Sequence, residues 1–366
     1  MKKEREMTRK AVYIASTNEL SGKSAVTIAL ALLAKQAGEK VGYFKPIGLA
    51  SAVSEKGESF DEDVQTMKSI LSLSVSDEQI CPFTLRKDEF LEDLENLSKV
   101  NCIEKVTNFY REAAEKKDIM LIEGASSLSS GSFFGCSVPK LAVQFNAEIL
   151  LVETLKEGLV VDDVLQARDY CAKWEAKLLG VVLNRVPRNK TAKVAQVIKP
   201  LLEKNGINVL GLIPEDSIIS ALTVEEIYAV IGGKILAGKE GMDRTVQTVL
   251  IGAMTPESAV KYFHKAKNNL IITGGDRTDI IFAALETGTS ALILTGNLYP
   301  SAKIFPRADE LEVPIILVPY DTYTTLQMVQ KIVGKIKPTD KRRITRAKKL
   351  VEENVDWKRI LSIERP

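Results

Sequence analysis

Gly22, Lys23 and Ser24 are the residues with the clearest chemical potential, because they follow an apolar run at 11–16 and begin an apolar helical stretch. Backbone N–H groups at a helix N-terminus favour anions, and the Lys23 ammonium would reach the terminal phosphates of a nucleotide. The Ser24 hydroxyl would help to hold Mg²⁺, so the arrangement predicts a nucleoside triphosphate site. Thr17 stands where a full phosphate loop has glycine, and a plain strand–turn–helix connection is the alternative.

Two charged residues stand where other apolar runs end. Lys45, held before Pro46, can deliver positive charge to a phosphate or carboxylate, or can be an exposed lysine at an ordinary turn. Glu123 follows the run 119–122, where a carboxylate is unfavourable unless it is paired or binds a metal. We expect Glu123 at a Mg²⁺ site, because Mg²⁺ takes oxygen ligands from one or two carboxylates and from phosphates.

Asp63 and Asn184 complete the expected site. Asp63, beside Glu62, either caps the helix that follows or faces the phosphate loop as a carboxylate for Mg²⁺. Asn184 either reads an adenine edge through its amide or forms a turn before a proline. The nucleotide-binding candidates are Thr17, Asn18, Gly22, Lys23, Ser24 and Asn184; the metal candidates are Ser24, Asp63 and Glu123; the catalytic candidates are Lys23 and Lys45.

A parallel sheet would bring these residues to one edge. Short apolar runs lie at 11–16, 41–44, 119–122, 149–152, 180–183 and 208–213, and helices are expected at 23–37, 62–72, 100–116, 158–173 and 190–204. Continuous apolar runs of this length suit strands buried on both faces, and their alternation with helices implies right-handed crossovers. Ligands bind outside the carboxyl ends of such strands. Residues 1–215 are therefore predicted to form a doubly wound, mostly parallel α/β domain of the P-loop NTPase type.

A second alternation of strands and helices predicts a smaller α/β domain over residues 216–335. Its possible second site is the turn formed by Gly274, Gly275, Asp276, Arg277 and Thr278, between an apolar strand and a helix. Such a turn can accept an anion, whereas a helix capped by Asp276 with a surface ion pair is the alternative. Residues 336–366, rich in Lys, Arg and Glu, are expected to form a charged helix or tail.

Composition narrows the class of protein. The 366 residues suit two domains, and 45% hydrophobic with 27% charged residues is typical of a globular chain. The net charge of +2 gives no footprint for nucleic acid or a membrane surface. No apolar run approaches the ~20 residues of a transmembrane helix, and the first ten residues are too polar for a secretory signal. We therefore expect a cytoplasmic protein without nucleic-acid or membrane partners.

Over residues 10–213 the sequence resembles the family of dethiobiotin synthetase, the cobyrinic acid a,c-diamide synthases and the N-terminal region of long bacterial phosphate acetyltransferases. The matching runs are STNELSGKS, GYFKPIG, DEDV, IEGA and VLNRVP. The resemblance implies a homodimer or higher homo-oligomer. It also implies roles for particular residues: phosphate and Mg²⁺ binding for Lys23 and Ser24, metal binding for Asp63 and Glu123, contact with substrate and phosphate for Lys45, and contact with the base for Asn184.

Two departures from dethiobiotin synthetase lie near the transferred phosphoryl group. Glu19 and Leu49 stand where that enzyme has a threonine and a serine. The loss of both hydroxyls argues against dethiobiotin synthesis and leaves ATP binding in place. The second domain resembles the DRTGG domain through GGDRTD at 274–279, and the pairing resembles the front part of long phosphate acetyltransferases. Because the downstream acetyl-transferring domain is missing, we expect no acetyl transfer from this polypeptide alone.

The sequence leaves three hypotheses for activity. The chain is an ATP-dependent enzyme that activates an unidentified small carboxylate by phosphoryl transfer, or a nucleotide-responsive regulator that partners a separate acetyltransferase or another protein. The third hypothesis is a degenerate scaffold without nucleotide. The lost hydroxyls favour sensing over dethiobiotin-type catalysis, whereas the retained Lys23, Ser24, Asp63 and Glu123 favour Mg²⁺–ATP binding.

Overall fold

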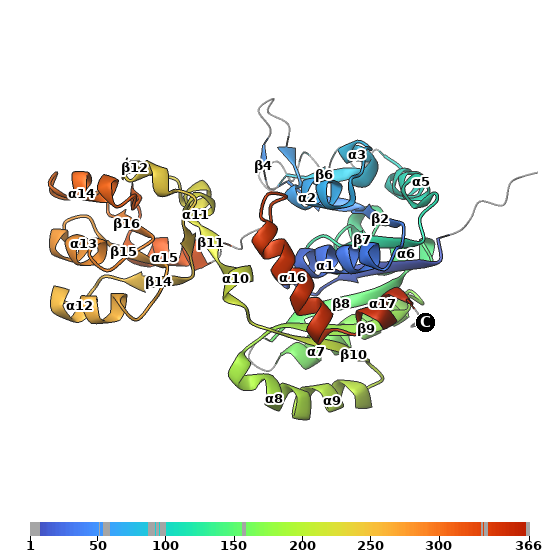
Figure 1. Ribbon diagram of the computed structural model, residues 1–366. Coiled ribbons are helices and arrows are strands. Elements are labelled where there is room, and N and C mark those ends of the chain that lie inside the picture. Colours follow the sequence, from blue (N-terminus) through green and yellow to red (C-terminus); the bar gives the residue numbers. More distant parts are fainter. Residues whose placement is uncertain are drawn as a thin grey trace, which may run out of the picture. The chain divides into compact units, whose positions relative to one another are not determined.

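The structure is a computed structural model that describes residues 8–50, 52–53, 59–86, 92, 95, 100–155, 159–330, 332 and 336–363. The chain forms two compact units (Figure 1). Unit 1 comprises Met1–Asp216 together with Lys335–Pro366, and unit 2 comprises Ser217–Gly334. Unit 2 is therefore inserted, in sequence, into unit 1. Residues 54–58 and 364–366, which belong to the predicted domains 1–215 and 336–366, lie outside the described residues.

A six-stranded parallel sheet forms the centre of unit 1, with strand order β10-β9-β8-β1-β7-β2. The strands are β1 (Lys10–Ala15), β2 (Val41–Phe44), β7 (Ile119–Glu123), β8 (Glu148–Thr154), β9 (Leu178–Val186) and β10 (Val209–Pro214). All of their pairings are parallel. Smaller pairs are β3 (Ile47–Leu49) with β6 (Phe83–Leu85) and β4 (Ala52–Val53) with β5 (Ser59–Phe60). The doubly wound α/β fold predicted from the sequence is confirmed.

Helices cover both faces of this sheet. One face packs against α5 (Cys102–Ala114), α6 (Val138–Gln144), α7 (Val160–Lys173) and α9 (Lys199–Lys204). The other face carries α1 (Lys23–Gln36), with α2 (Glu62–Leu71) beside it. Short helices complete the unit: α3 (Asp77–Ile80), α8 (Thr191–Lys193), the 3₁₀ turns Ser132–Phe134 and Arg188–Lys190, and a π-helical turn Val194–Ile198. The helix expected at 190–204 is thus a composite of three helical types.

The C-terminal segment packs within unit 1. Helix α16 (Lys341–Asn354) lies against α1, and α17 (Trp357–Leu361) contacts α1 and β1 (Figure 1). Between them, Val355 forms a bridge with Gly211 of β10. A Cβ at Gly211 would lie 2.7 Å from Val355 Cγ2 and 2.8 Å from the Asn354 carbonyl oxygen, so this close approach requires glycine. Arg343 of α16 is buried and pairs with Asp340, whereas most of the other charged residues of this helix are exposed. Ala347, Leu350 and Val351 are buried.

Unit 2 has its own five-stranded sheet, with order β12-β17-β16-β15-β14. Its elements are α10 (Ser217–Ser220), β11 (Leu222–Thr223), α11 (Val224–Ile231), β12 (Lys234–Ala237), a 3₁₀ turn Lys239–Gly241, β13 (Thr245–Val246), β14 (Thr248–Ile251), α12 (Pro256–Phe263), β15 (Asn269–Gly274), α13 (Thr278–Leu285), β16 (Ala291–Thr295), α14 (Ile304–Glu310), β17 (Ile315–Leu317) and α15 (Thr322–Gln330). Strand β12 is antiparallel to β17, and the other pairings in this sheet are parallel. Two apolar clusters cover the two faces.

One segment of unit 2 is divided between two sheets. Residues 245–251 are interrupted at Gln247, since β13 pairs antiparallel with β11 while β14 joins the main sheet. The backbone N–H of Gln247 donates instead to the Asn268 carbonyl oxygen. Among the described residues, no helix combines the length and apolarity that crossing a bilayer requires.

Candidate functional site

The loop between β1 and α1 has the geometry of a phosphate-binding turn. Gly22 is the N-cap of α1 and adopts a left-handed conformation with φ 88°. A Cβ at this position would lie 2.2 Å from Asn184 Nδ2, so both backbone conformation and space require glycine. The following amides stand at the N-terminus of a long helix, where the helix dipole favours an anion.

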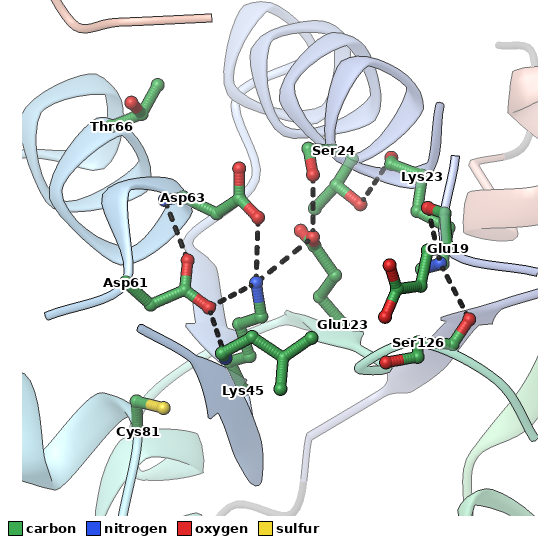
Figure 2. Close-up of polar contacts among 12 residues, drawn as sticks. Glu19, Lys23, Ser24, Lys45, Asp61, Asp63, Thr66, Cys81, Glu123 and Ser126 are labelled. Atoms are coloured by element: carbon green, nitrogen blue, oxygen red, sulfur yellow. Dashed lines mark hydrogen bonds and ion pairs between the residues drawn. The ribbon is translucent and has the colours of Figure 1, made fainter. Parts of the chain in front are cut away.

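Lys23 lies buried under this loop. Its ammonium donates to Ser16 Oγ at 2.6 Å and approaches the Asn18 carbonyl oxygen at 3.3 Å. It also approaches the carbonyl oxygens of Glu19 and Ser126 at 3.4 and 3.5 Å (Figure 2). Burial lowers the pKa of Lys23 to about 8, and the nearby Lys45 ammonium acts in the same direction. Carbonyl oxygens are weaker partners for an ammonium than the charged oxygens of phosphates. The hydrogen-bond acceptors of Lys23 are thus neutral, and the carboxylates of Glu123, Glu153 and Asp63 only partly offset the effect of burial on its pKa.

Glu153, a buried residue near the C-terminal end of β8, accepts hydrogen bonds from the start of the loop. The backbone N–H of Thr17 donates to Glu153 Oε1 at 2.6 Å, and Thr17 Oγ1 donates to Oε2 at 2.8 Å. Asn18 Nδ2 in turn donates to Thr17 Oγ1 at 2.7 Å. Burial raises the pKa of Glu153, and its hydrogen bonds from Thr17 oppose that rise. A threonine in place of the pattern's glycine therefore has a specific partner here.

A second cation lies among three carboxylates at the next part of the sheet edge. Lys45 Nζ is 2.8 Å from Asp61 Oδ2, 2.7 Å from Asp63 Oδ2 and 3.6 Å from Glu123 Oε1 (Figure 2). Burial opposes the charged form of Lys45, but Asp63, Glu123 and Asp61 outweigh it and hold its pKa above the usual value. Lys45 is not the exposed lysine of the alternative interpretation.

Glu123 joins this cluster to the phosphate loop. Ser24 Oγ donates to Glu123 Oε1 at 2.8 Å, and the Tyr43 hydroxyl donates to Oε2 at 3.2 Å. Burial raises the pKa of Glu123, whereas Lys45 lowers it. The hydroxyl of Ser24 and the carboxylates of Glu123 and Asp63 therefore converge, as the sequence predicts for metal ligands.

The donor set suits Mg²⁺ in chemical type. Two carboxylates and a hydroxyl are hard oxygen ligands, which Mg²⁺ accepts alongside phosphates and water. Among the described residues, however, no group of three or more His, Cys, Asp or Glu is arranged to hold a metal ion by itself. The remaining ligands would have to come from phosphate oxygens and water, as expected for a nucleotide-borne metal.

Two sequence interpretations need correction. The side chain that caps α2 is Asp61, whose Oδ1 accepts from the Asp63 N–H at 3.0 Å, and neither Glu62 nor Asp63 is the N-cap. In unit 2, Arg277 rather than Asp276 occupies the N-cap position of α13, and it makes no side-chain cap. Asp276 stands one residue too early in the turn to cap that helix.

Asn184 lies at the opposite end of the phosphate loop from Glu153. Its Nδ2 donates to the Ser21 carbonyl oxygen at 2.8 Å, and its Oδ1 accepts from the Arg185 N–H at 2.9 Å. Arg185 itself has φ 53°, an uncommon left-handed conformation for a residue with a side chain. The amide therefore contacts the phosphate loop, and its contact with a base stays a prediction.

The second candidate turn lies in unit 2, after β15. Arg277 Nε and Nη2 pair with the Asp279 carboxylate at 3.0 and 3.1 Å, and Nη2 donates to the Met254 carbonyl oxygen at 2.9 Å. Gly274 ends β15, and a Cβ at Gly275 would lie 1.6 Å from the Leu298 carbonyl oxygen. Thr278 Oγ1 accepts from the Ser301 N–H at 3.4 Å. The surface ion pair is present, and ligand binding at this turn stays a prediction.

Sequence reasoning missed Glu153, Asp61 and Tyr43. Each contacts a residue from another part of the chain. Glu153 accepts a hydrogen bond from Thr17, Asp61 forms an ion pair with Lys45, and Tyr43 donates to Glu123. For Asp61 a local signal existed, since it begins an acidic run directly before α2. Glu153 had a signal of the kind used for Glu123, a carboxylate at the end of an apolar run.

Comparisons with known proteins match both units. A family model described as an AAA domain matches residues 10–223, and one described as a DRTGG domain matches residues 226–332. The phosphate acetyltransferase of Nitratidesulfovibrio vulgaris is 26% identical over 362 residues, covering 94% of this chain and 50% of that protein. The phosphate acetyltransferase of Synechocystis sp. is 25% identical over 365 residues, covering 96% of this chain and 51% of that protein. The chain thus spans about half the length of these relatives.

A solved structure is similar over part of the chain. It is a cobyrinic acid a,c-diamide synthase from Mycobacterium smegmatis with bound ADP and magnesium, 15% identical to this chain with a TM-score of 0.39. The match covers 57% of this chain and 88% of that one.

Proposed function

This chain belongs to the AAA domain family matched over residues 10–223, carries a DRTGG domain and is homologous to phosphate acetyltransferases, and from that premise we propose that unit 1 binds Mg²⁺–ATP. Lys23 and the first amides of α1 would bind the β- and γ-phosphates. Ser24, Asp63 and Glu123 would supply the protein ligands of the metal, and Lys45 would face the γ-phosphate.

One observation carries this proposal: two buried ammonium groups, a hydroxyl and two carboxylates converge where α1 begins. Burying charged groups costs free energy unless partners satisfy them, and the Lys23 ammonium donates its hydrogen bonds to a hydroxyl and to carbonyl oxygens. A polyphosphate would supply the anionic partner for Lys23, and Mg²⁺ would bridge that anion to the carboxylates.

The test is calorimetric titration of the full chain with ATP and Mg²⁺. Lys23→Ala should weaken binding by at least roughly tenfold, because it removes a charge-assisted hydrogen bond and the only ammonium at the loop's centre. Lys35→Ala is the matched control, since Lys35 lies in the last turn of the same helix. Equal affinities for Lys23→Ala and the unsubstituted protein would contradict the proposal.

We propose that the bound nucleotide regulates rather than drives chemistry in this chain. Glu19 and Leu49 stand near the expected γ-phosphate without the hydroxyls of dethiobiotin synthetase, and the chain, which carries a DRTGG domain, is similar to phosphate acetyltransferases over about half of their length. A separate acetyltransferase is the partner that this homology suggests. Tight ATP binding without phosphate release would support the regulatory role.

Phosphoryl transfer to a carboxylate is the second candidate function. Lys23 and Lys45 favour it, because two buried cations could stabilise the charge that develops on a transferred phosphoryl group. Phosphate release that depends on one added small carboxylate, and that Lys45→Met abolishes, would favour the enzyme over the regulator.

A further inference from the structure

The Lys45 cluster is almost completely removed from solvent. The side chains of Lys45, Asp61 and Glu123 are 5%, 1% and 2% exposed, and that of Asp63 is 12% exposed. In such surroundings a charge is tolerated only when partners of opposite charge satisfy it. The Lys45 ammonium lies within salt-bridge distance of both Asp63 and Glu123. It therefore neutralises part of the carboxylate charge, as a metal ion would in its place.

The three carboxylates are not equivalent. Asp61 is tied to protein donors: Oδ1 accepts from the Asp63 N–H, and Oδ2 accepts from the Leu49 N–H, each at 3.0 Å. These bonds fix Asp61 at the start of α2, on the side of Lys45 away from Ser24 (Figure 2). Asp63 and Glu123 are the carboxylates that the proposed function assigns to Mg²⁺, and Lys45 contacts both of them.

We propose that Lys45 is the resident counter-ion of this cluster in the nucleotide-free protein, and that Asp61 is a positioning residue that retains Lys45 when Asp63 and Glu123 bind Mg²⁺. This inference rests on the proposed function and names how its metal site is regulated. Without a nucleotide, a divalent ion must compete with an ammonium already in place. A triphosphate adds enough negative charge for both cations to be held, so metal and nucleotide bind together.

The first test measures a divalent cation without any nucleotide. Mn²⁺ is titrated into the full-length protein and free Mn²⁺ is followed by electron paramagnetic resonance, which requires no activity. Lys45→Met should bind Mn²⁺ at least about tenfold more tightly than the unsubstituted protein, because it removes a unit positive charge a few Å from the metal ligands. Lys35→Met, a change of the same type on α1, should leave Mn²⁺ binding unchanged. Equal Mn²⁺ affinities of Lys45→Met and the unsubstituted protein would overturn the proposal.

The second test examines Asp61 through a double-substitution cycle. Asp61→Asn keeps a good helix N-cap and a carbonyl acceptor but loses the charge that holds Lys45. It should raise the Mg²⁺ concentration needed for half-maximal ATP binding several-fold. In the Lys45→Met background, Asp61→Asn should leave that Mg²⁺ concentration unchanged, because there is no ammonium left to retain. An equal effect in both backgrounds would mean that the negative charge of Asp61 attracts the metal directly, without Lys45. That result would overturn the assigned role of Asp61.

The outcomes separate this inference from the proposed function. Tight Mn²⁺ binding by Lys45→Met in a protein that never binds ATP would support the counter-ion role and contradict the nucleotide site. ATP binding with unchanged Mn²⁺ affinity would do the reverse. Lys45→Gln, which keeps a polar group at the end of β2, replaces Lys45→Met if the latter does not fold, as judged by tryptophan fluorescence.

Discussion

Lys23 is a buried cation whose charged form is disfavoured in the ligand-free protein. Its pKa is lowered to about 8, chiefly by burial, so the unfolded chain binds more protons than the folded one between that value and the usual 10.5. The contribution of Lys23 to the free energy of unfolding therefore rises with pH through this window. A bound polyphosphate would reverse the effect, because an adjacent anion favours the charged ammonium.

We predict that Mg²⁺–ATP affinity falls above about pH 8, by at most about tenfold per pH unit, because binding then requires uptake of one proton by Lys23. Calorimetry at several pH values, in buffers of different ionisation enthalpy, measures both the affinity and the proton uptake. Lys23→Arg is the control, since a guanidinium stays charged and its weaker binding should be independent of pH. A flat profile for the unsubstituted protein would contradict the prediction.

Glu153 places a buried carboxylate beside the phosphate loop, and its charge and its hydrogen bonds can be tested separately. Glu153→Gln retains an acceptor for the Thr17 N–H and should increase ATP affinity several-fold by removing a negative charge near Lys23. Glu153→Ala leaves the Thr17 N–H without that acceptor and should destabilise unit 1 by about 1–3 kcal/mol. Titration with ATP and urea unfolding measure the two effects. Loss of affinity in Glu153→Gln would mean that the carboxylate itself is required.

At the residue scale, the sequence indicated the charged residues that lie at or after the C-terminal ends of β1, β2 and β7. Lys23, Lys45 and Glu123 could be found because each follows its own apolar run. Glu153 could not be assigned to the loop, because its contact depends on β8 lying next to β1, which is a matter of strand order. The position of Lys45 could be predicted, but its pairing with Asp61 could not. Asp61 lies close to Lys45 because it is the N-cap residue of α2, whereas the sequence indicated Glu62 or Asp63 as that cap.

At the scale of elements, α1 is the helix on which the site depends, and it is buried on almost every side. Val26, Ile28, Leu30 and Leu33 are all buried although they do not share one face. A helix that is apolar all round must be covered on all sides, so the sequence of α1 implied a covering element. The charged residues at 336–366 concealed that element, because the apolar stripe of α16 is narrow and is surrounded by Lys, Arg and Glu.

Leu350 of α16 offers a measure of this packing. Leu350→Ala should lower the free energy of unfolding of unit 1 by about 2–5 kcal/mol, because it leaves a cavity between α16 and its neighbours. Both tryptophans, Trp174 and Trp357, lie in unit 1, so urea unfolding followed by tryptophan fluorescence reports on that unit alone. The exposed Glu352→Ala on the same helix is the control. A stability change equal to that of the control would contradict the packing seen here.

At the scale of the whole molecule, the sequence correctly indicated two α/β units in order but not that the chain returns to the first. Alternating runs reveal strands and helices locally, whereas the docking of α16 and α17 involves contacts across more than half of the chain. The contacts of α16 and α17 with α1 are such contacts. Val355 also pairs with Gly211 of β10, and Leu361 is buried.

We predict that the fragment 217–334 folds alone, because it has its own sheet with an apolar cluster on each face. The fragment 1–334 should lose cooperative unfolding, since it lacks the helices that cover α1. Circular dichroism of the first fragment and tryptophan fluorescence of the second, both against urea, measure these results. A denaturation midpoint for 1–334 equal to that of the full chain would show that the return segment is dispensable.

The anchors at the two ends of unit 2 have a practical consequence. The chain leaves unit 1 at Asp216, whose Oδ2 accepts from Arg346 Nε and Nη2 at 2.8 and 2.6 Å, and it rejoins at Ile336, whose carbonyl oxygen accepts from Thr66 Oγ1 of α2 at 2.8 Å. Both junctions are thus fixed to the body that contains the phosphate loop, one of them through α2, the helix that carries Asp63. Unit 2 can therefore be replaced by another domain between these two junctions. A fluorescent protein inserted there would make the chain a biosensor whose fluorescence reports nucleotide binding.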